Sequence, residues 1–172
     1  ALDYSQKALE TYQKKPDADQ GVKRLLEIEI PELSDGTIML YSVAREAGSR
    51  TKIAVYTEYN NVDPIGAVIG EKGRRIGAVL KELNGEKIDV VLYDKDPVKF
   101  IANALSPAKE LKVTIKDENK KEALALANDK NLSLAIGRKG QNVKLASRLT
   151  HYKIEVKPLE TQSAVVEESG DE

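Results

Sequence analysis

The sequence contains no cysteine and no tryptophan, and phenylalanine occurs once among its 172 residues. Without cysteine the chain can form neither a disulfide nor a cysteine-ligated zinc site, which agrees with a reducing compartment. With so few large aromatic side chains, any core must be built from Ile, Leu, Val and Ala. The sequence also lacks a signal peptide and a run of about 18 apolar residues. These absences predict a soluble, cytoplasmic protein without a membrane partner.

Groups that carry out catalysis are equally scarce. His151 is the only histidine, and it fits an exposed turn residue just before a strand. No Ser or Thr has a recognisable base partner, and the phosphate-loop pattern G-x-x-x-x-G-K-[ST] is missing. Acidic residues such as Asp117 and Glu118 fall at turns, where solvated acids are common. The sequence therefore predicts that the chain is not an enzyme and has no cofactor and no metal site.

The net formal charge is −1, which by itself argues against a nucleic-acid partner. The distribution of the charges argues for one. Residues 134–153 contain five Lys or Arg and no acid, whereas residues 160–172 contain five acids and no base. A phosphate backbone responds to the local field, so the basic stretch matters more than the total charge.

A short pattern occurs twice. Residues 69–73 read Ile-Gly-Glu-Lys-Gly, and residues 136–140 read Ile-Gly-Arg-Lys-Gly, 67 positions later. A single G-x-x-G is expected about once by chance in a chain of this size, given that Gly makes up roughly 7% of residues. Two copies of the longer pattern, each between an apolar run and an amphipathic helix, indicate an internal repeat.

The residue types of this pattern suit a nucleic-acid backbone. Glycine accepts a positive φ, so the chain can turn sharply between two helices and approach a ligand closely. The second glycine opens a helix whose free N–H groups attract anions. Lys72 and Lys139 add a cation at each loop tip, as in the nucleotide-clamping loop of KH domains. The alternative is a pair of ordinary helix–turn–helix corners with exposed lysines.

The predicted RNA-binding residues are those of the two loops and of the helical turns that follow them. They are Gly70, Glu71, Lys72, Gly73, Arg74, Arg75, Gly137, Arg138, Lys139, Gly140, Gln141, Asn142, Lys144 and Arg148.

The apolar patterns predict the same set of elements in each half of the chain. In the first half a helix, two strands, two helices and a strand cover residues 21–30, 37–43, 53–56, 63–69, 74–83 and 88–93. In the second half the corresponding segments are 98–105, 111–115, 122–127, 131–136, 141–149 and 152–156. Residues 122–127 favour a helix by propensity, but they alternate with period two where the repeat needs a strand. We therefore expect a strand there.

Four segments follow from this order. They are a linker helix or non-native remnant over residues 1–20, a first domain over 21–94, a second domain over 95–158, and an acidic disordered tail over 159–172.

Four runs of residues resemble the NusA family of bacterial transcription elongation, termination and antitermination factors, and the element order resembles the type II KH fold. The runs are residues 45–55, 62–67, 84–91 and 135–146. The resemblance implies an α+β chain of two tandem type II KH domains, each a three-stranded sheet covered by helices. It also implies binding of single-stranded RNA.

The family usually carries two further domains ahead of the KH pair, one that binds RNA polymerase and an OB-fold that binds RNA. Neither is present in this sequence. The full-length family also binds RNA polymerase, but we do not expect this chain to bind it directly. We expect a monomer. Glu71 departs from the neutral or basic residue expected in the first loop. Two other functions remain open, a protein-interaction scaffold and a KH module of a ribosome-assembly protein.

Overall fold

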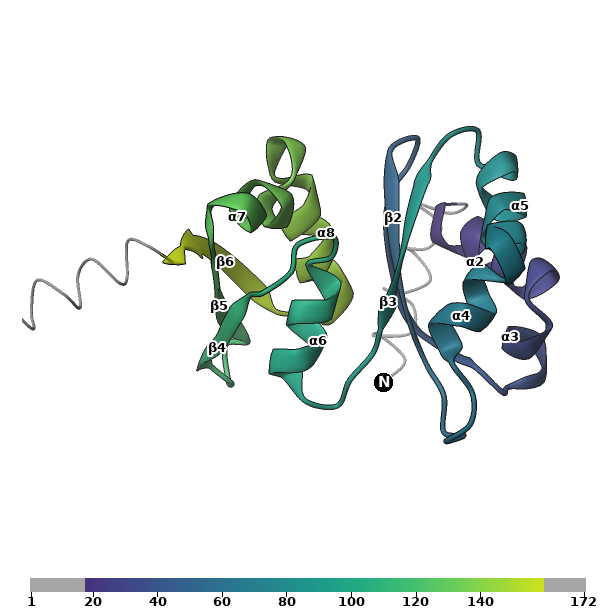
Figure 1. Ribbon diagram of the computed structural model, residues 1–172, viewed down its shortest axis with the longest axis horizontal. Helices are drawn as coiled ribbons and strands as arrows, with labels where there is room; N and C mark the ends of the chain where they lie inside the picture. The colour runs from purple at the N-terminus through teal and green to yellow at the C-terminus, as the bar shows by residue number, and fades with distance from the viewer. Residues whose placement is uncertain (1–17, 160–172) are drawn as a thin grey trace, which may run out of the picture. The chain divides into compact units, whose positions relative to one another are not determined.

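Two three-stranded sheets organise the chain, one in each half (Figure 1). The computed structural model describes residues 18–159. The chain divides into two compact units between Val90 and Val91. The helix expected near the N-terminus and the acidic tail lie outside the described residues, apart from residues 18–20, which belong to the first described helix, and residue 159.

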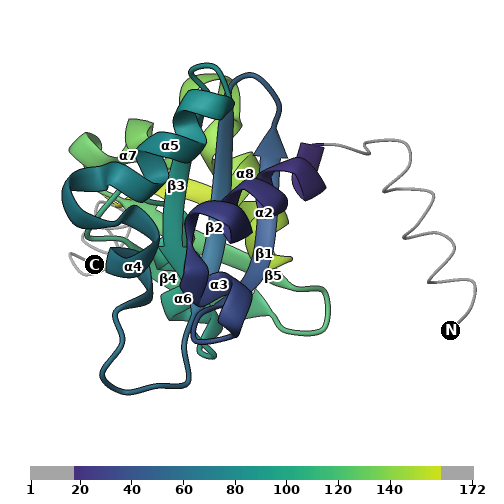
Figure 2. The same ribbon diagram turned by 90° about the vertical axis from the view of Figure 1, so that its right-hand side faces the viewer.

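In the first unit, the helices cover one face of the sheet (Figures 1 and 2). The strands lie in the order β1-β2-β3, and β1 pairs with β2 in the antiparallel sense. The core between sheet and helices consists of Val22, Leu26, Ile30, Ile38, Ile53, Val55, Val68 and Val79. The elements are α2 (Ala18–Glu29), α3 (Pro31–Asp35), β1 (Met39–Glu46), β2 (Arg50–Tyr56), α4 (Pro64–Ile69), the single turn η1 (Glu71–Gly73), α5 (Arg74–Glu82) and β3 (Lys87–Leu92).

Helix α3 was not expected from the sequence. The sequence pattern ends the first helix at residue 30, but Pro31 occupies the first position of a further helix of five residues. Proline is favoured there because its missing N–H would have no partner in the first turn and its φ is already helical. Gly36 then ends the helix with φ of +85°. The short helix places Glu32 beside α4 and α5, where its carboxylate forms an ion pair with Arg75.

The hairpin of β1 and β2 is longer than the apolar pattern predicts. The pattern predicts strands over residues 37–43 and 53–56, yet Arg45 pairs with Thr51 and Glu46 pairs with Arg50. Only residues 47–49 form the turn. The apolar pattern does not mark these strand ends, because their side chains are polar and bind a partner from a distant part of the chain.

The main partner is Glu86, which lies just before β3 and is 1% exposed. The Arg45 guanidinium donates to both of its carboxylate oxygens, at 2.8–3.2 Å. The Gly48 amide donates at 2.9 Å and the Thr51 hydroxyl at 2.7 Å. Burial alone would raise the pKa of Glu86, but these hydrogen bonds outweigh it and hold the pKa below its usual value. Glu86 thus fixes the tip of the hairpin against the start of β3.

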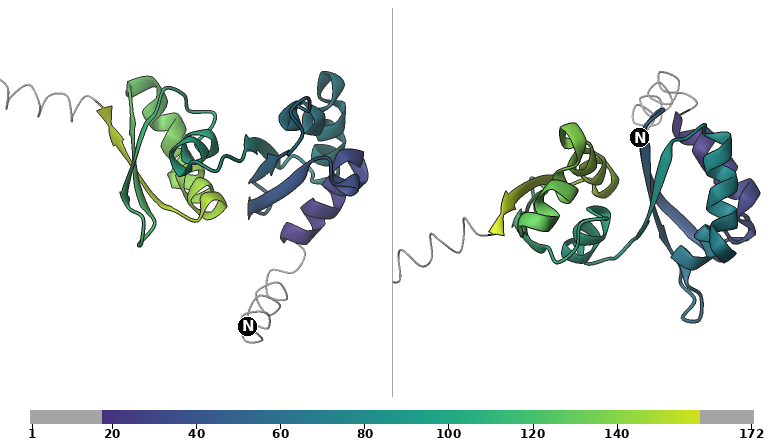
Figure 3. Two further views of the ribbon diagram at one scale, coloured as in Figure 1. Left: turned by 90° about the horizontal axis from the view of Figure 1, so that it is seen from below. Right: turned by 45° about the horizontal axis from the view of Figure 1, so that its top comes forward.

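The second unit repeats the arrangement (Figures 1 and 3). Strand β4 pairs with β5 in the antiparallel sense, and β5 pairs with β6 in the parallel sense. Helix α8 packs against both α6 and α7. The elements are α6 (Pro97–Ala104), β4 (Lys112–Asp117), β5 (Glu122–Ala127), α7 (Asp129–Ile136), the single turn η2 (Arg138–Gly140), α8 (Gln141–Thr150) and β6 (Lys153–Pro158).

The strand expected at residues 122–127 is confirmed as β5, the central strand of the second sheet. Ala123, Ala125 and Ala127 face the core and are buried. Small side chains on this face let the helices approach the sheet closely. Pairing with strands on both sides therefore overrides the helix propensity of the segment.

The buried carboxylate gives a stability prediction. Replacing Glu86 with Gln removes the charge that Arg45 binds and leaves part of the network unsatisfied, so the free energy of unfolding should fall by about 2–4 kcal/mol. The matched variant Glu82→Gln, at an exposed position of α5, should change it by less than about 0.5 kcal/mol. Urea unfolding with hydrogen exchange on β1 and β2 measures both.

The same experiment has a pH dependence. Because the pKa of Glu86 is lowered in the folded state, its stabilisation is complete above the ordinary value of 4.5 and is lost as the pH falls through the lower folded value. In Glu86→Gln, the part of the fall in unfolding free energy at acidic pH that comes from Glu86 should be absent. Equal stability of the two Gln variants would contradict the structural role of Glu86.

Candidate nucleic-acid interface

The two repeated loops adopt the same backbone conformation. Gly70 has φ, ψ of 78°, 170°, and Gly137 has 78°, 172°. The lysines follow with 56°, 27° at Lys72 and 57°, 27° at Lys139. Each loop is closed by a hydrogen bond of 3.1 Å from the second glycine's amide to the first glycine's carbonyl. The sequence repeat is therefore a structural repeat of one turn between two helices.

The first glycine of each loop is required by space as well as by its positive φ. A Cβ on Gly70 would lie 2.7 Å from the Cγ of Arg75, and a Cβ on Gly137 would lie 2.6 Å from the Cβ of Asn142. Both are closer than real Cβ atoms come to a neighbour. A Cβ on Gly73 or Gly140 would meet nothing within 4 Å. At these positions the demand comes from the left-handed φ of 72° and 74° alone.

The side chains at the loop tips are exposed and mostly cationic. Arg138 and Lys139 stand side by side in the second loop, whereas Glu71 stands beside Lys72 in the first. Both lysines have a left-handed backbone, which is unfavourable for a residue with a Cβ. The turn is therefore held by its surroundings and not by local preference.

No side chain caps the helix after either loop, and the amides of its first residues, Arg74 and Gln141, donate back to the carbonyls of Glu71 and Arg138. The residue before α5 is Gly73 and the residue before α8 is Gly140, and neither position supplies a capping side chain. The first amides of a helix carry a partial positive charge and have no partner within the helix. Each loop therefore places an exposed lysine beside the positive end of the following helix.

Further cations follow each loop along the next helix, and the second unit has more of them. Lys144 and Arg148 are exposed on α8 and lie four residues apart, so they share one face of the helix that starts at the loop. The equivalent positions of α5 are Gly77 and Lys81. The second loop thus continues into a longer row of positive charge than the first.

Two of the predicted contact residues point inward. Arg75 is half-buried; its Nη1 donates to the Ala67 carbonyl at 2.9 Å and it also forms an ion pair with Glu32. Asn142 is 2% exposed and donates from Nδ2 to two backbone carbonyls. These two side chains are occupied within the fold, so we do not retain them as direct RNA contacts. Gln141 is half-buried at the start of α8.

The sequence analysis missed Glu32. Arg75 is the largest cause that lowers the pKa of this carboxyl, through a side-chain hydrogen bond. No local pattern marks Glu32, because it lies 43 residues before its partner. Arg75 and Asn142 carry a recognisable signal, since each stands two residues after the second glycine of its loop.

Apolar side chains border the loops. Ile69, directly before Gly70, is 36% exposed, while Ile65 and Ile76 pack against the core of the first unit.

Among residues 18–159, no three His, Asp or Glu side chains are grouped so that they could hold a metal ion. No helix in that part of the chain has the length and apolar character needed to cross a bilayer.

Family models match both units. A model of the NusA-like first KH domain matches residues 17–93, and a model of the NusA-like second KH domain matches residues 97–164. Between them the two models match most of the chain.

Curated relatives and a solved structure agree with these models. The chain is 54% identical over 136 residues to the transcription termination/antitermination protein NusA of Bacillus subtilis, covering 79% of this chain and 36% of that protein. It is 50% identical over 133 residues to NusA of Thermus thermophilus, covering 77% and 34%. It thus spans about a third of the length of these relatives. The crystal structure of APE1850 shares the fold, with a TM-score of 0.56 and 22% identity over 78% of this chain and 96% of that chain. The chain therefore belongs to the NusA-like family, of which it carries the first and second KH domains.

Proposed function

We propose that this chain is the RNA-binding module of a NusA-like transcription elongation, termination and antitermination factor of the bacterial cytoplasm. Its two G-x-x-G loops hold nascent single-stranded RNA. The observation that carries the proposal is the identical backbone conformation of two glycine loops, each with an exposed lysine and an uncapped helix start. The NusA names of the relatives supply the transcriptional context.

Each loop would act by position and charge, without a chemical step. The sugar-phosphate backbone lies across the glycines, where no Cβ holds it away, and is attracted by the positive end of the following helix. Lys72 and Lys139 neutralise a phosphate each. Neighbouring bases rest on apolar side chains beside the loop, such as Ile69. This matches the way KH loops clamp about four nucleotides.

The contact set follows from the exposure of these residues. We assign backbone contacts to the four glycines and charge contacts to the exposed cations, with Glu71 as an opposing charge. The cations are Lys72, Arg74, Arg138, Lys139, Lys144 and Arg148. We assign the domains to residues 21–94 and 95–158, and we place polymerase binding in other parts of the full-length relatives.

The proposal predicts that binding depends on the length of the RNA. Because each loop handles about four nucleotides, an unstructured tract of roughly ten should bind the chain more tightly than one of roughly four. Fluorescence anisotropy with labelled oligonucleotides of both lengths measures this. Equal affinity for both would contradict a two-loop mode. Preference for a structured ribosomal RNA fragment over both tracts would favour the ribosome-assembly function.

Salt should weaken the complex in a defined way. If three to five of the six exposed cations neutralise phosphates, log K should fall against log of the salt concentration with a slope of roughly −2 to −3.5. A titration at four salt concentrations gives this slope. An RNA affinity that does not respond to salt would exclude phosphate clamping and favour the protein-interaction scaffold.

The two loops should not contribute equally. Lys139→Ala should weaken RNA binding about fivefold, because its loop contains no opposing acid, and Lys72→Ala about twofold, because Glu71 already cancels part of its field. Glu71→Gln should tighten binding by up to about twofold. The folds should be retained, since all three side chains are exposed. An equal or larger loss at Lys72, with no gain from Glu71→Gln, would show that loop charge does not set the order.

A further inference from the structure

We propose that Arg75 and Asn142 are positioning residues that hold the two G-x-x-G loops in their binding conformation, and that Glu32 controls the first of them. Each side chain ties the helix after its loop to the last turn of the helix before it. The inference deepens the proposed function, because it concerns the loops that bind RNA there. The place of Arg75 beside the loop first suggests that the residue binds a phosphate. The positioning role proposed for it is different.

The two residues occupy equivalent positions of the repeat. Arg75 stands two residues after Gly73, and Asn142 stands two residues after Gly140. In both units this residue contacts the first glycine of its own loop so closely that a Cβ there would collide with it. Two different side chains therefore meet the same geometric demand at the same point of the fold.

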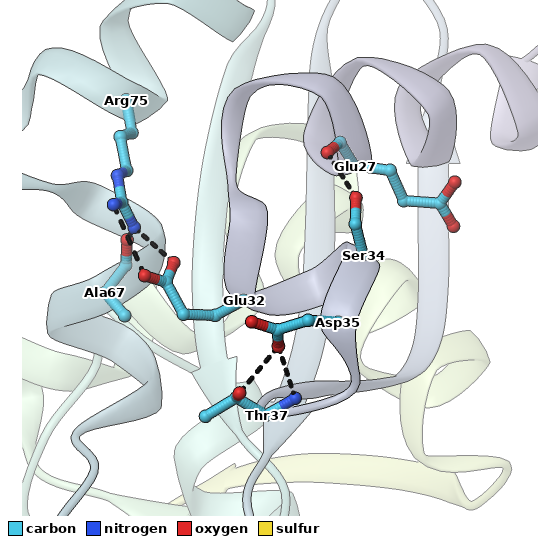
Figure 4. A network of polar contacts seen from close by, with 7 residues as sticks. All are labelled: Glu27, Glu32, Ser34, Asp35, Thr37, Ala67 and Arg75. Atoms are coloured by element: carbon cyan, nitrogen blue, oxygen red, sulfur yellow. Dashed lines mark hydrogen bonds and ion pairs between the residues drawn. The ribbon is translucent and has the colours of Figure 1, made fainter.

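The first clamp is an ion pair at the edge of the first unit (Figure 4). The Arg75 guanidinium lies between the Ala67 carbonyl, in the last turn of α4, and the Glu32 carboxylate on α3. The Ala67 carbonyl is one of the four at the end of a helix that have no partner within it. Arg75 caps it, and Glu32 fixes the guanidinium in that place. Side-chain exposures of 33% and 30% leave this pair open to water and salt.

The second clamp is buried and neutral. Asn142 donates from Nδ2 to the Ala135 carbonyl, in the last turn of α7, and to the Leu105 carbonyl after α6, each at 3.0 Å. Its Oδ1 accepts no hydrogen bond from the described residues. The side chain is therefore held by the two hydrogen bonds that Nδ2 donates. No charge is involved. The second loop should therefore keep its conformation at salt concentrations that loosen the first.

The clamps explain how two exposed lysines keep a left-handed backbone. Lys72 and Lys139 have φ of 56° and 57°, a region that costs a non-glycine residue free energy. Such a conformation persists only where the surroundings enforce it. Here each clamp joins the helix before the turn to the helix after it, and so holds the lysine in the left-handed conformation. Releasing the clamp should then free the turn to leave the conformation that presents its glycines and its lysine to a phosphate.

The test compares two glutamates near the same loop. Glu32→Gln and Glu71→Gln each remove one negative charge at constant size, but only the first weakens the clamp. If charge alone mattered, both would tighten RNA binding. We expect Glu32→Gln to weaken binding of a ten-nucleotide RNA about three- to tenfold, and to speed amide hydrogen exchange of residues 70–73 in the free protein. Glu71→Gln should do neither.

Three results decide the inference. Tighter RNA binding by Glu32→Gln, or unchanged exchange at residues 70–73, overturns it. If the unmodified chain fails to bind RNA, the proposed function fails, while the exchange of the free protein still decides whether the clamp holds the loop. Circular dichroism of all variants checks that the fold is retained.

A charge-conserving variant separates the two roles of Arg75. Arg75→Lys keeps a cation beside the loop but lacks the planar fork that reaches both Ala67 and Glu32. A positioning role predicts faster loop exchange and weaker RNA binding, similar to Glu32→Gln. Full affinity in Arg75→Lys with slow exchange would assign the residue to phosphate binding and overturn the inference.

The second loop supplies an internal comparison. Asn142→Leu removes both donors while keeping the number and branching of the side-chain heavy atoms, so exchange should rise at residues 137–140 and stay unchanged at residues 70–73. A uniform rise across both units would indicate general destabilisation instead and would count against a positioning role of Asn142. Should that variant not fold, the Glu32 and Arg75 variants decide the inference by themselves.

Discussion

Both units are built around a close approach between two helices across a four-residue turn. At the first glycine of each turn, the following helix lies so near that no side chain fits between them. This contact, together with the left-handed backbone of the next residues, aims the start of α5 and of α8 outward. The positive end of each helix and the lysine beside it come together only because the turn is held in this shape.

The rest of each unit can be understood as support for that turn. In the first unit α3, a helix of five residues, carries the carboxylate that fixes Arg75. At the hairpin, Glu86 joins Arg45, Gly48 and Thr51, and so secures the sheet on which the helices pack. In the second unit the small side chains of β5 allow the helices to lie close to the sheet. Buried polar contacts of this kind stabilise one arrangement because leaving any of their groups unpaired is costly.

The two units share a fold but differ in charge. The second loop has two adjacent cations, a row of further cations along α8 and an uncharged clamp. The first loop has a glutamate at its tip and a clamp made from an ion pair. Exposed charges respond to ionic strength, whereas a buried amide does not. The two loops thus differ in charge through a few side chains, while their backbone conformation is the same.

The sequence by itself determined the repeat, the two loops, most of the helices and strands, and the family. The family followed from the resemblance of four runs of residues, whereas the repeat, the loops and the elements depend on glycine spacing and on apolar periodicity, which act over a few residues and are visible in the chain. Even the ambiguous segment at residues 122–127 was resolved by its place in the repeat. Only the tertiary structure decided the roles of Glu32, Arg75, Asn142 and Glu86. A charged or amide side chain looks the same in sequence whether it faces water or a partner, and these partners lie up to 43 residues away. Whether such a group binds a ligand or supports the fold is therefore set by what the folded chain brings beside it.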